Sequence, residues 1–100
     1  MKVLLSERVE TDIANQLEYG VHSFGQSAAE RTFARVDRFL FKFLPQHPDA
    51  GRHHAAHGMF EAAIPRTPFV VFYRVDEIAR EIIVLALFHH AQDRSTFEPE

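Results

Sequence analysis

The stretch FVVFYRVDEIAREIIVLALF, residues 69–88, decides the fold. Residues 69–75 and 81–88 are rich in β-branched and aromatic side chains, and the polar segment 76–80 between them has the length of a hairpin loop. Residues 82–88 are apolar at every position, so both faces of that strand are apolar. Such a pattern is typical of a central strand that is covered on both sides. The sequence therefore predicts an antiparallel hairpin inside a sheet.

Two helices are predicted upstream of this hairpin. Apolar residues recur every three or four positions along the first one: Val9, Ile13, Leu17, Val21 and Phe24. Ser6 precedes this stripe, and its hydroxyl can cap the helix. The second helix is predicted to begin at Ser27, which forms a capping box with Glu30, and to end before Pro45.

Strands are also expected at residues 1–5 and 59–64, while residues 45–58 are predicted to be a loop because they contain turn formers and no clean period. The element order is then β-α-α-β-β-β. We expect an α+β fold in which a helical hairpin packs on a small, mostly antiparallel sheet.

Length and composition restrict the classes of function. One hundred residues suit a single domain, 1–100, with a polar tail from about residue 94 that we expect to be frayed. The chain has no cysteine, which excludes disulfides and thiol chemistry. Its apolar runs are too short to span a membrane. The net charge of −3 argues against direct nucleic-acid binding, which normally requires a basic excess.

Three short motifs follow one another in the second half of the chain. They are Leu44-x3-Pro48-x2-Gly51-Arg52, then Phe72-Tyr73-Arg74-Val75, then Ile83-Val84-Leu85 leading into His89-x3-Asp93. In order and spacing they resemble the ParE branch of the RelE/ParE toxin superfamily, the toxin halves of bacterial type II toxin–antitoxin modules. Thr11-Asp12 in the first helix and Ala28-Ala29 with Phe33 in the second fit the same resemblance, which extends over roughly residues 3 to 94.

The resemblance implies a cytoplasmic protein that a cognate antitoxin, ParD-like or similar, neutralises by wrapping its carboxy-terminal segment around the toxin. The expected state is a hetero-oligomer of the two, of the kind that serves plasmid stabilisation. RelE-like members of the superfamily cut mRNA on the ribosome, whereas ParE-like members act on DNA gyrase.

The residues favour the gyrase branch. The RelE pattern places lysines in the strand after the loop, an arginine early in the next strand, and arginine with tyrosine at the carboxy end. Here residues 60–64 contain no lysine, 69–71 no arginine, and 89–92 neither arginine nor tyrosine. We therefore expect gyrase inhibition by protein contact without catalysis, and a RelE-like mRNA endonuclease as the alternative.

A third possibility is an inactive relative that only binds its antitoxin. Many ParE-like sequences have an arginine where this chain has Gln92, directly before Asp93. Arg94 lies two positions further on and could substitute for it.

Two sets of contact residues are predicted. The residues expected to contact the target are Arg52, Arg66, Arg74, His89, Gln92, Asp93 and Arg94. The alternative interpretation of the arginines is a set of separate surface ion pairs, with Gly51-Arg52 only turning the chain.

The antitoxin is expected to contact Phe33, Phe39, Phe41 and Phe43. Apolar residues in segment 39–44 spread beyond one helical stripe, which indicates either an exposed aromatic groove, the favoured interpretation, or a core helix buried on two sides. Among the seven histidines, His53-x3-His57 has the spacing of a metal-ligand pair. A solvated loop is the favoured interpretation, and we expect no metal site, cofactor or catalytic residue.

Overall fold

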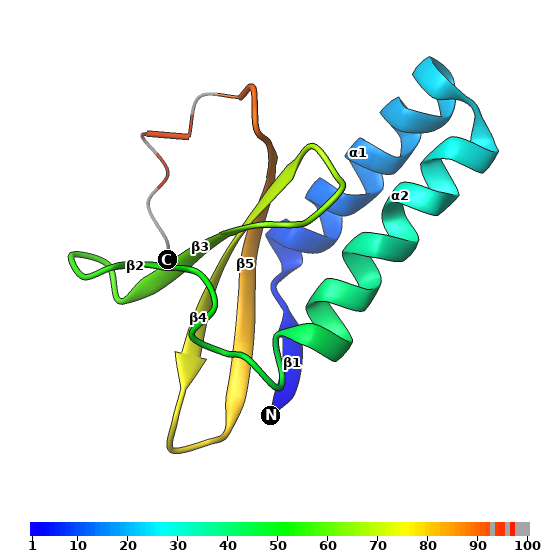
Figure 1. Cartoon of the computed structure of the whole chain (residues 1–100). Coiled ribbons are helices and arrows are strands. Elements are labelled where there is room, and N and C mark those ends of the chain that lie inside the picture. The colour runs from blue at the N-terminus through cyan, green and yellow to red at the C-terminus, as the bar shows by residue number, and fades with distance from the viewer. Residues whose placement is uncertain (93, 96, 98–100) are drawn as a thin grey trace.

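The computed structural model of the chain describes residues 1–92, 94, 95 and 97. Two helices pack against one face of a twisted sheet (Figure 1). The elements are β1 (Lys2–Leu5), α1 (Glu7–Phe24), α2 (Gln26–Arg38), the π-helical turn η1 (Phe39–Phe43), β2 (Arg52–His54), β3 (Met59–Ala63), β4 (Phe69–Asp76) and β5 (Glu81–His89). The sheet order is β1-β5-β4-β3-β2, with β1 parallel to β5 and the other pairs antiparallel. The predicted α+β class is confirmed.

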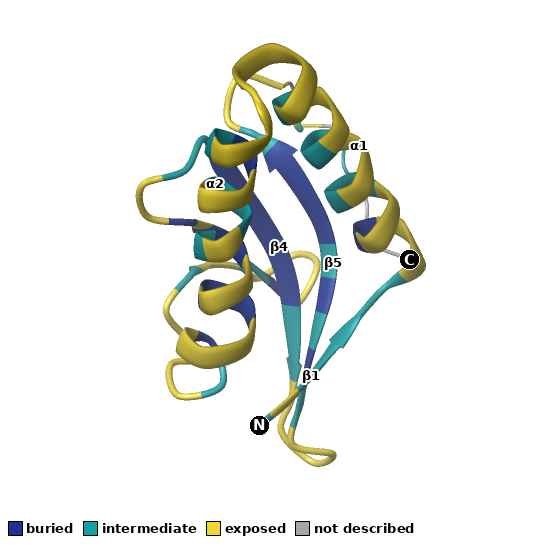
Figure 2. Cartoon of the chain, turned by 90° about the vertical axis from the view of Figure 1, so that its right-hand side faces the viewer, coloured by how far each residue is buried: buried dark blue, intermediate teal, exposed yellow. Residues whose placement is uncertain are grey.

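The hairpin of β4 and β5 forms the centre of the sheet, as its sequence predicts. Phe69 pairs with His89 at one end and Asp76 with Glu81 at the other, with a register shift between Phe72 and Tyr73. Both strands have hydrogen-bonded neighbours on each side. Their largely buried residues form the inner layer beneath the helices (Figure 2).

The main core lies between the helices and the sheet. The helical side supplies Val9, Val36, Leu40 and Leu44, all almost completely buried. The sheet side supplies Val71, Tyr73, Ile82 and Val84 among others. Burying an aliphatic side chain of this kind contributes about 1.5–3 kcal/mol, so this layer dominates the stability of the fold.

Helix α1 is attached to β5 through two polar side chains. Ser6 caps the helix as predicted: its Oγ accepts from the N–H of Val9 at 3.0 Å and donates to the carbonyl of Leu85 at 2.9 Å. Further along, Asp12 Oδ2 accepts from the N–H of Leu87 at 3.0 Å. The carboxylate therefore satisfies a backbone donor of β5 beyond the end of β1.

The predicted start of α2 is wrong. The helix begins at Gln26, and Gly25, with φ 89°, separates it from α1. Ser27 therefore lies inside the first turn, where it makes no capping hydrogen bond. Glu30 instead accepts from the Gln26 side chain at 2.9 Å. Glycine sets the boundary because it tolerates a positive φ without steric cost.

The end of the predicted apolar stripe on α1 is also wrong. Val21 is exposed and Phe24 is 72% exposed. Figure 1 shows the reason, since the tip of the helical hairpin extends beyond the sheet and has no strand beneath it.

Two local features escaped the sequence prediction. Part of the predicted loop 45–58 is strand β2, whose three residues pair with β3, His53 lying opposite Phe60. In η1 the N–H of Leu44 donates to the carbonyl of Phe39 at 3.0 Å, a π-helical bond that closes the turn. No helix in the described part of the chain is long and apolar enough to cross a membrane.

Candidate functional site: the open face of the sheet

The face of the sheet opposite the helices has a second apolar cluster. Its buried members are Met59, Val70, Phe72, Ala86 and Phe88. They alternate along the strands with the residues of the main core, because successive side chains point to opposite faces. We call this surface the open face, since no helix covers it.

Glu61 on β3 is the electrostatic centre of the open face. Its Oε1 lies 2.9 Å from His54 Nε2 and 3.4 Å from Arg52 Nη2. Its Oε2 lies 3.1 Å from both Nε and Nη2 of Arg94. One carboxylate, whose side chain is 14% exposed, is thus shared by three basic side chains.

This environment changes the pKa of Glu61. Burial alone would raise the pKa, since it penalises the charged carboxylate. The hydrogen bonds from His54 and Arg94 and the positive charges of Arg94 and Arg52 outweigh burial, and the net effect lowers the pKa below its usual value. Glu61 is therefore held as a carboxylate that binds cations.

Arg94 and Phe97 lie over the open face, whereas most of the tail that we expected to be frayed, from about residue 94, lies outside the described residues. The Phe97 ring lies 4.9 Å from that of Phe72 and 5.5 Å from that of Phe88. The Arg8 guanidinium lies 5.1 Å from the Phe88 ring centroid and 5.0 Å from that of Phe97. Together with the ion pair of Arg94, these contacts hold Arg94 and Phe97 against the open face.

Three of the predicted target-contact residues meet at one groove. Arg52, Gln92 and Arg94 line a hollow of about 430 Å³, together with His54 and Glu61. Alternation along β4 places Arg74 on the same face as Phe72 and outside this hollow.

The other predicted target residues lie elsewhere. Arg66, in the β3–β4 turn, lines a separate groove beside α2, and His89 lines an apolar pocket at the helical hairpin. Asp93 lies outside the described residues. The structure therefore divides the predicted target set among several surfaces.

Gly51, part of the family-like motif, has a structural role. Its N–H donates to the hydroxyl of Tyr73 at 3.0 Å. A Cβ at this position would lie 2.8 Å from the carbonyl oxygen of Glu61. Burial raises the pKa of Tyr73, although the Gly51 hydrogen bond opposes the change. Gly51 thus allows the chain to pass close to β3 and positions Arg52 beside Glu61.

Gln92 closes the turn after β5. Its Oε1 accepts from the N–H of His89 at 2.6 Å, and its backbone N–H donates to the His89 carbonyl at 2.9 Å. Gln16 of α1 reaches the same Oε1 at 3.4 Å.

The histidines of the 53–57 segment have separate environments. His54 pairs with Glu61, whereas the ring of His53 packs on that of Phe60 at 4.9 Å. Residues 1–92, 94, 95 and 97 contain no group of three or more metal-ligating side chains positioned around one ion.

The predicted antitoxin residues are divided by burial. Phe39 is buried in the core, while Phe41 and Phe43 are 43% and 41% exposed. Segment 39–44 is therefore part core and part exposed aromatic surface, so each of the two interpretations describes some of its residues. Phe39 is largely buried, and its ring stacks on that of Phe43 at 5.1 Å where the two line a groove beside α2.

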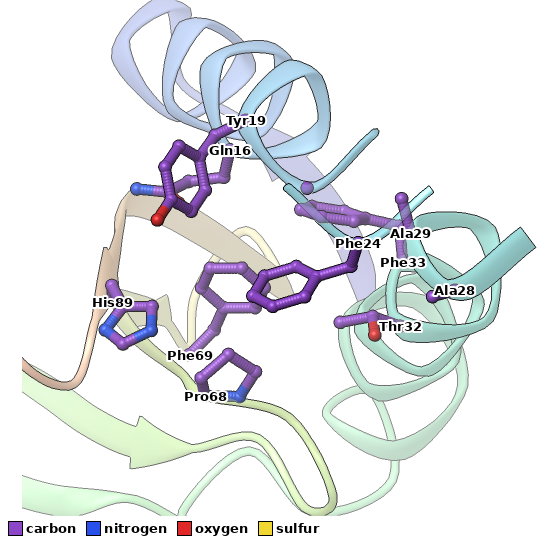
Figure 3. Close-up of a pocket in the computed structure, with 11 residues that line it drawn as sticks. Gln16, Tyr19, Phe24, Ala28, Ala29, Thr32, Phe33, Pro68, Phe69 and His89 are labelled. Carbon is purple, nitrogen blue, oxygen red and sulfur yellow. The ribbon is translucent and has the colours of Figure 1, made fainter. Parts of the chain in front are cut away.

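Phe33 lies at a different surface, an apolar pocket of about 390 Å³ at the helical hairpin. Figure 3 shows Phe24, Phe33 and Phe69 gathered in this pocket, with Tyr19 at its edge. Tyr19 and Phe24 are 60% and 72% exposed, and neither was predicted to lie at a binding surface. Their position beyond the sheet could not be inferred from helical spacing.

The chain matches one family model over residues 3–94: the ParE toxin of the type II toxin–antitoxin system parDE. This match covers nearly all of the described sheet, both helices and the Glu61 cluster. The chain belongs to the ParE toxin family. The resemblance to the RelE/ParE superfamily and the predicted fold class are both confirmed.

Solved structures with the same fold include two toxin–antitoxin systems. The chromosomal ParDE system from P. aeruginosa matches with a TM-score of 0.68 and 19% identity, over 89% of this ParE-family chain and 95% of that chain. The RelBE2 toxin–antitoxin complex from Mycobacterium tuberculosis matches with a TM-score of 0.62 and 21% identity. This match covers 88% of the ParE-family chain and 95% of the chain in that complex. No curated protein sequence matches this ParE-family toxin.

Proposed function

We propose that this ParE-family toxin inhibits DNA gyrase by direct protein contact in the cytoplasm, without catalysis. The observation that carries the proposal is the Glu61 cluster. A ribonuclease needs cations that are available to the charge of a reacting phosphate. On the open face Arg52 and Arg94 instead bind the protein's own carboxylate. This arrangement supports a contact surface more than a phosphate site.

The second part of the proposal is that a cognate antitoxin holds the toxin inactive in a hetero-oligomer. Tyr19 and Phe24 at the helical hairpin, and Phe41 and Phe43 on η1, are large apolar side chains exposed to solvent. Exposed apolar surface of this kind typically marks a protein interface. The two solved relatives are themselves described as toxin–antitoxin systems, which supports a partner of this class.

A supercoiling assay tests the choice of target. Relaxed plasmid, ATP and purified gyrase are incubated with increasing amounts of the toxin, and we expect supercoiling to be lost. Arg52→Ala should weaken the inhibition, whereas Arg80→Ala, an exposed arginine of the β4–β5 hairpin, should leave it unchanged. In parallel, programmed ribosomes are incubated with the toxin and the mRNA is examined for cuts.

Full supercoiling activity together with cleaved ribosomal mRNA would overturn the proposal in favour of a RelE-like endonuclease. An inactive relative is a separate candidate, which Gln92 favours because it occupies the turn after β5 where many ParE-like sequences have arginine. Induced expression without antitoxin would then leave growth unchanged, and gyrase and mRNA would both be unaffected.

A further inference from the structure

Basic residues follow one face of α2 into η1. Arg31, Arg35, Arg38 and Lys42 are separated by four, three and four positions, the spacing that places side chains on one helical face. The chain as a whole has a net charge of −3, so this basic stripe contrasts strongly with the rest of the protein.

The stripe lacks acidic partners within the described part of the chain. No ion pair between described residues includes a residue of the stripe or Arg66. Like charges along one helical face repel one another and destabilise the helix. An anionic partner would remove this cost, and the stripe is therefore suited to binding one.

An apolar groove lies beside the stripe. Arg35, Arg38 and Arg66 surround a hollow of about 210 Å³ that is also lined by Phe39 and Phe43. The Arg35 guanidinium donates to the carbonyl of Arg66 at 3.4 Å, which connects α2 to the β3–β4 turn. The stacked rings of the two phenylalanines, 5.1 Å apart, supply an apolar wall.

We propose that this arginine–phenylalanine groove docks an acidic protein segment that places carboxylates on the arginines and one bulky apolar side chain against Phe43. The inference rests on the proposed function in one respect, since the antitoxin is the partner expected to carry the segment. Arginine binds carboxylates bidentately, and a 41% exposed phenyl ring offers an apolar contact. A nucleic acid is the poorer fit because the basic stripe is confined to one helical face, whereas nucleic-acid binders normally carry a basic excess over the whole domain.

The experiment selects short random peptides, displayed on phage, against the full chain. We expect the selected peptides to be enriched in Asp and Glu and to carry an aromatic or aliphatic residue. Their affinity is then measured by fluorescence anisotropy against the wild type, the double variant R35E/R38E, and Phe43→Ala. R35E/R38E should weaken binding by at least about tenfold, as expected when attractive charges become repulsive.

Two matched controls identify the groove. Ile78→Ala removes an exposed apolar side chain that does not line the groove, and Arg80→Glu reverses a charge on the same β4–β5 hairpin. Both should bind the peptides like the wild type, whereas Phe43→Ala should bind several-fold more weakly. Circular dichroism shows whether each variant is folded, and the conservative R35Q/R38Q replaces R35E/R38E if the latter is not.

Three results would overturn the inference: selected peptides without acidic enrichment, affinity that Phe43→Ala leaves unchanged, or an RNA oligonucleotide that displaces the peptides and binds more tightly than they do. Because the assay contains no gyrase, its failure is distinct from a failure of gyrase inhibition. Each of the two proposals can therefore be wrong while the other stands.

Discussion

Glu61 shows how a single carboxylate can organise a whole face of this toxin. His54, Arg52 and Arg94 come from β2 and from the terminal segment, far apart in sequence, and all meet at this side chain. Sequence reasoning selected Arg52 and Arg94 as contact residues and did not single out Glu61. A lone glutamate in a strand carries no sequence signal, because its role comes from the pairing of β2 with β3.

We predict that Glu61→Gln destabilises the toxin most at neutral pH. The folded state lowers the pKa of Glu61, so its stabilising contribution is fully present above the unfolded value of 4.5 and is lost as the pH falls through the lower, folded pKa. Near pH 7 the loss of unfolding free energy should be about 1–3 kcal/mol, since the basic side chains around Glu61 lose its negative charge and one of its two acceptor oxygens. Urea unfolding of the wild type and of Glu61→Gln, repeated from neutral to acid pH, measures this difference in unfolding free energy.

The difference in unfolding free energy between wild type and Glu61→Gln should shrink as the solution is acidified. Glu77→Gln, at the exposed β4–β5 hairpin, serves as the control for loss of a surface carboxylate and should leave the unfolding free energy at neutral pH nearly unchanged. A difference that stays constant from neutral to acid pH would contradict the lowered pKa.

Gly51→Ala should destabilise the fold through a steric clash. The added methyl group would lie 2.8 Å from the Glu61 carbonyl oxygen and 3.1 Å from the Tyr73 hydroxyl. The backbone at Glu61 cannot easily move away, because it belongs to strand β3. We expect a loss of about 1–3 kcal/mol in chemical unfolding. Gly20→Ala is the control, because its Cβ would meet only Ala29 at 3.4 Å and alanine favours the helix. Equal stability of the two variants would refute the close approach at Gly51.

Gln92→Arg tests whether this position has a structural role. Arginine has no acceptor, so the N–H of His89 would lose its side-chain hydrogen bond. We expect the variant to be less stable by about 1 kcal/mol in thermal or urea unfolding. Gln92→Glu retains an acceptor oxygen and should keep more of the stability. If Gln92→Arg were as stable as the wild type, the turn after β5 would not depend on this side chain.

At the scale of elements, α1 is fixed to β5 by Asp12. This carboxylate accepts from the N–H of Leu87 at 3.0 Å and pairs with Arg8 at 3.4 Å. Asp12→Ala should cost about 1–3 kcal/mol because it leaves a partly buried backbone donor unsatisfied, whereas Asp12→Asn keeps an acceptor and should cost less. Hydrogen exchange at the Leu87 amide measures the effect directly, and unchanged protection in Asp12→Ala would exclude the bond.

The elements also show what sequence can and cannot predict. Long apolar segments such as β4 and β5 were predicted with nearly correct bounds, because a continuous apolar run directly reflects burial on both faces. Strand β2 was missed because three residues are too few to show a period. The start of α2 was missed because a glycine with positive φ set the boundary in place of a side-chain cap.

The candidate site was predicted less well than the fold for a related reason. Of the residues predicted to contact the target, Arg52, Gln92 and Arg94 line one groove, whereas Arg66 and His89 lie at other surfaces. Motif order indicates which residues matter to a family, but the turns between strands decide which of them meet.

At the scale of the whole molecule, the sheet separates two apolar clusters that are covered in different ways. The helices cover one cluster completely, whereas the open face is covered in part by Phe97, near the end of the chain. The exposed aromatic residues at the hairpin tip and on η1 lie outside both clusters. The exposed aromatic residues that are available to partners and the buried clusters that stabilise the fold thus lie in separate parts of this small protein.

Phe97→Ala should uncover the open face while leaving the main core intact. The ring contacts Phe72, Phe88 and the Arg8 guanidinium, and it does not belong to the core beneath the helices. We expect stronger fluorescence from a dye that binds exposed apolar surface, with a loss of unfolding free energy of about 1 kcal/mol, below the 1.5–3 kcal/mol of a fully buried ring.

The control for Phe97→Ala is Phe24→Ala, which removes an already exposed ring at the hairpin tip and should reduce dye binding. Both substitutions replace phenylalanine by alanine, but the expected changes in dye fluorescence are opposite. Phe97→Ala uncovers apolar neighbours and raises the fluorescence, whereas Phe24→Ala removes an exposed apolar ring and lowers it. Unchanged dye fluorescence in Phe97→Ala would mean that the terminal segment does not cover the sheet in solution. The open face would then be exposed even in the intact chain, and Arg94 would not be held at Glu61.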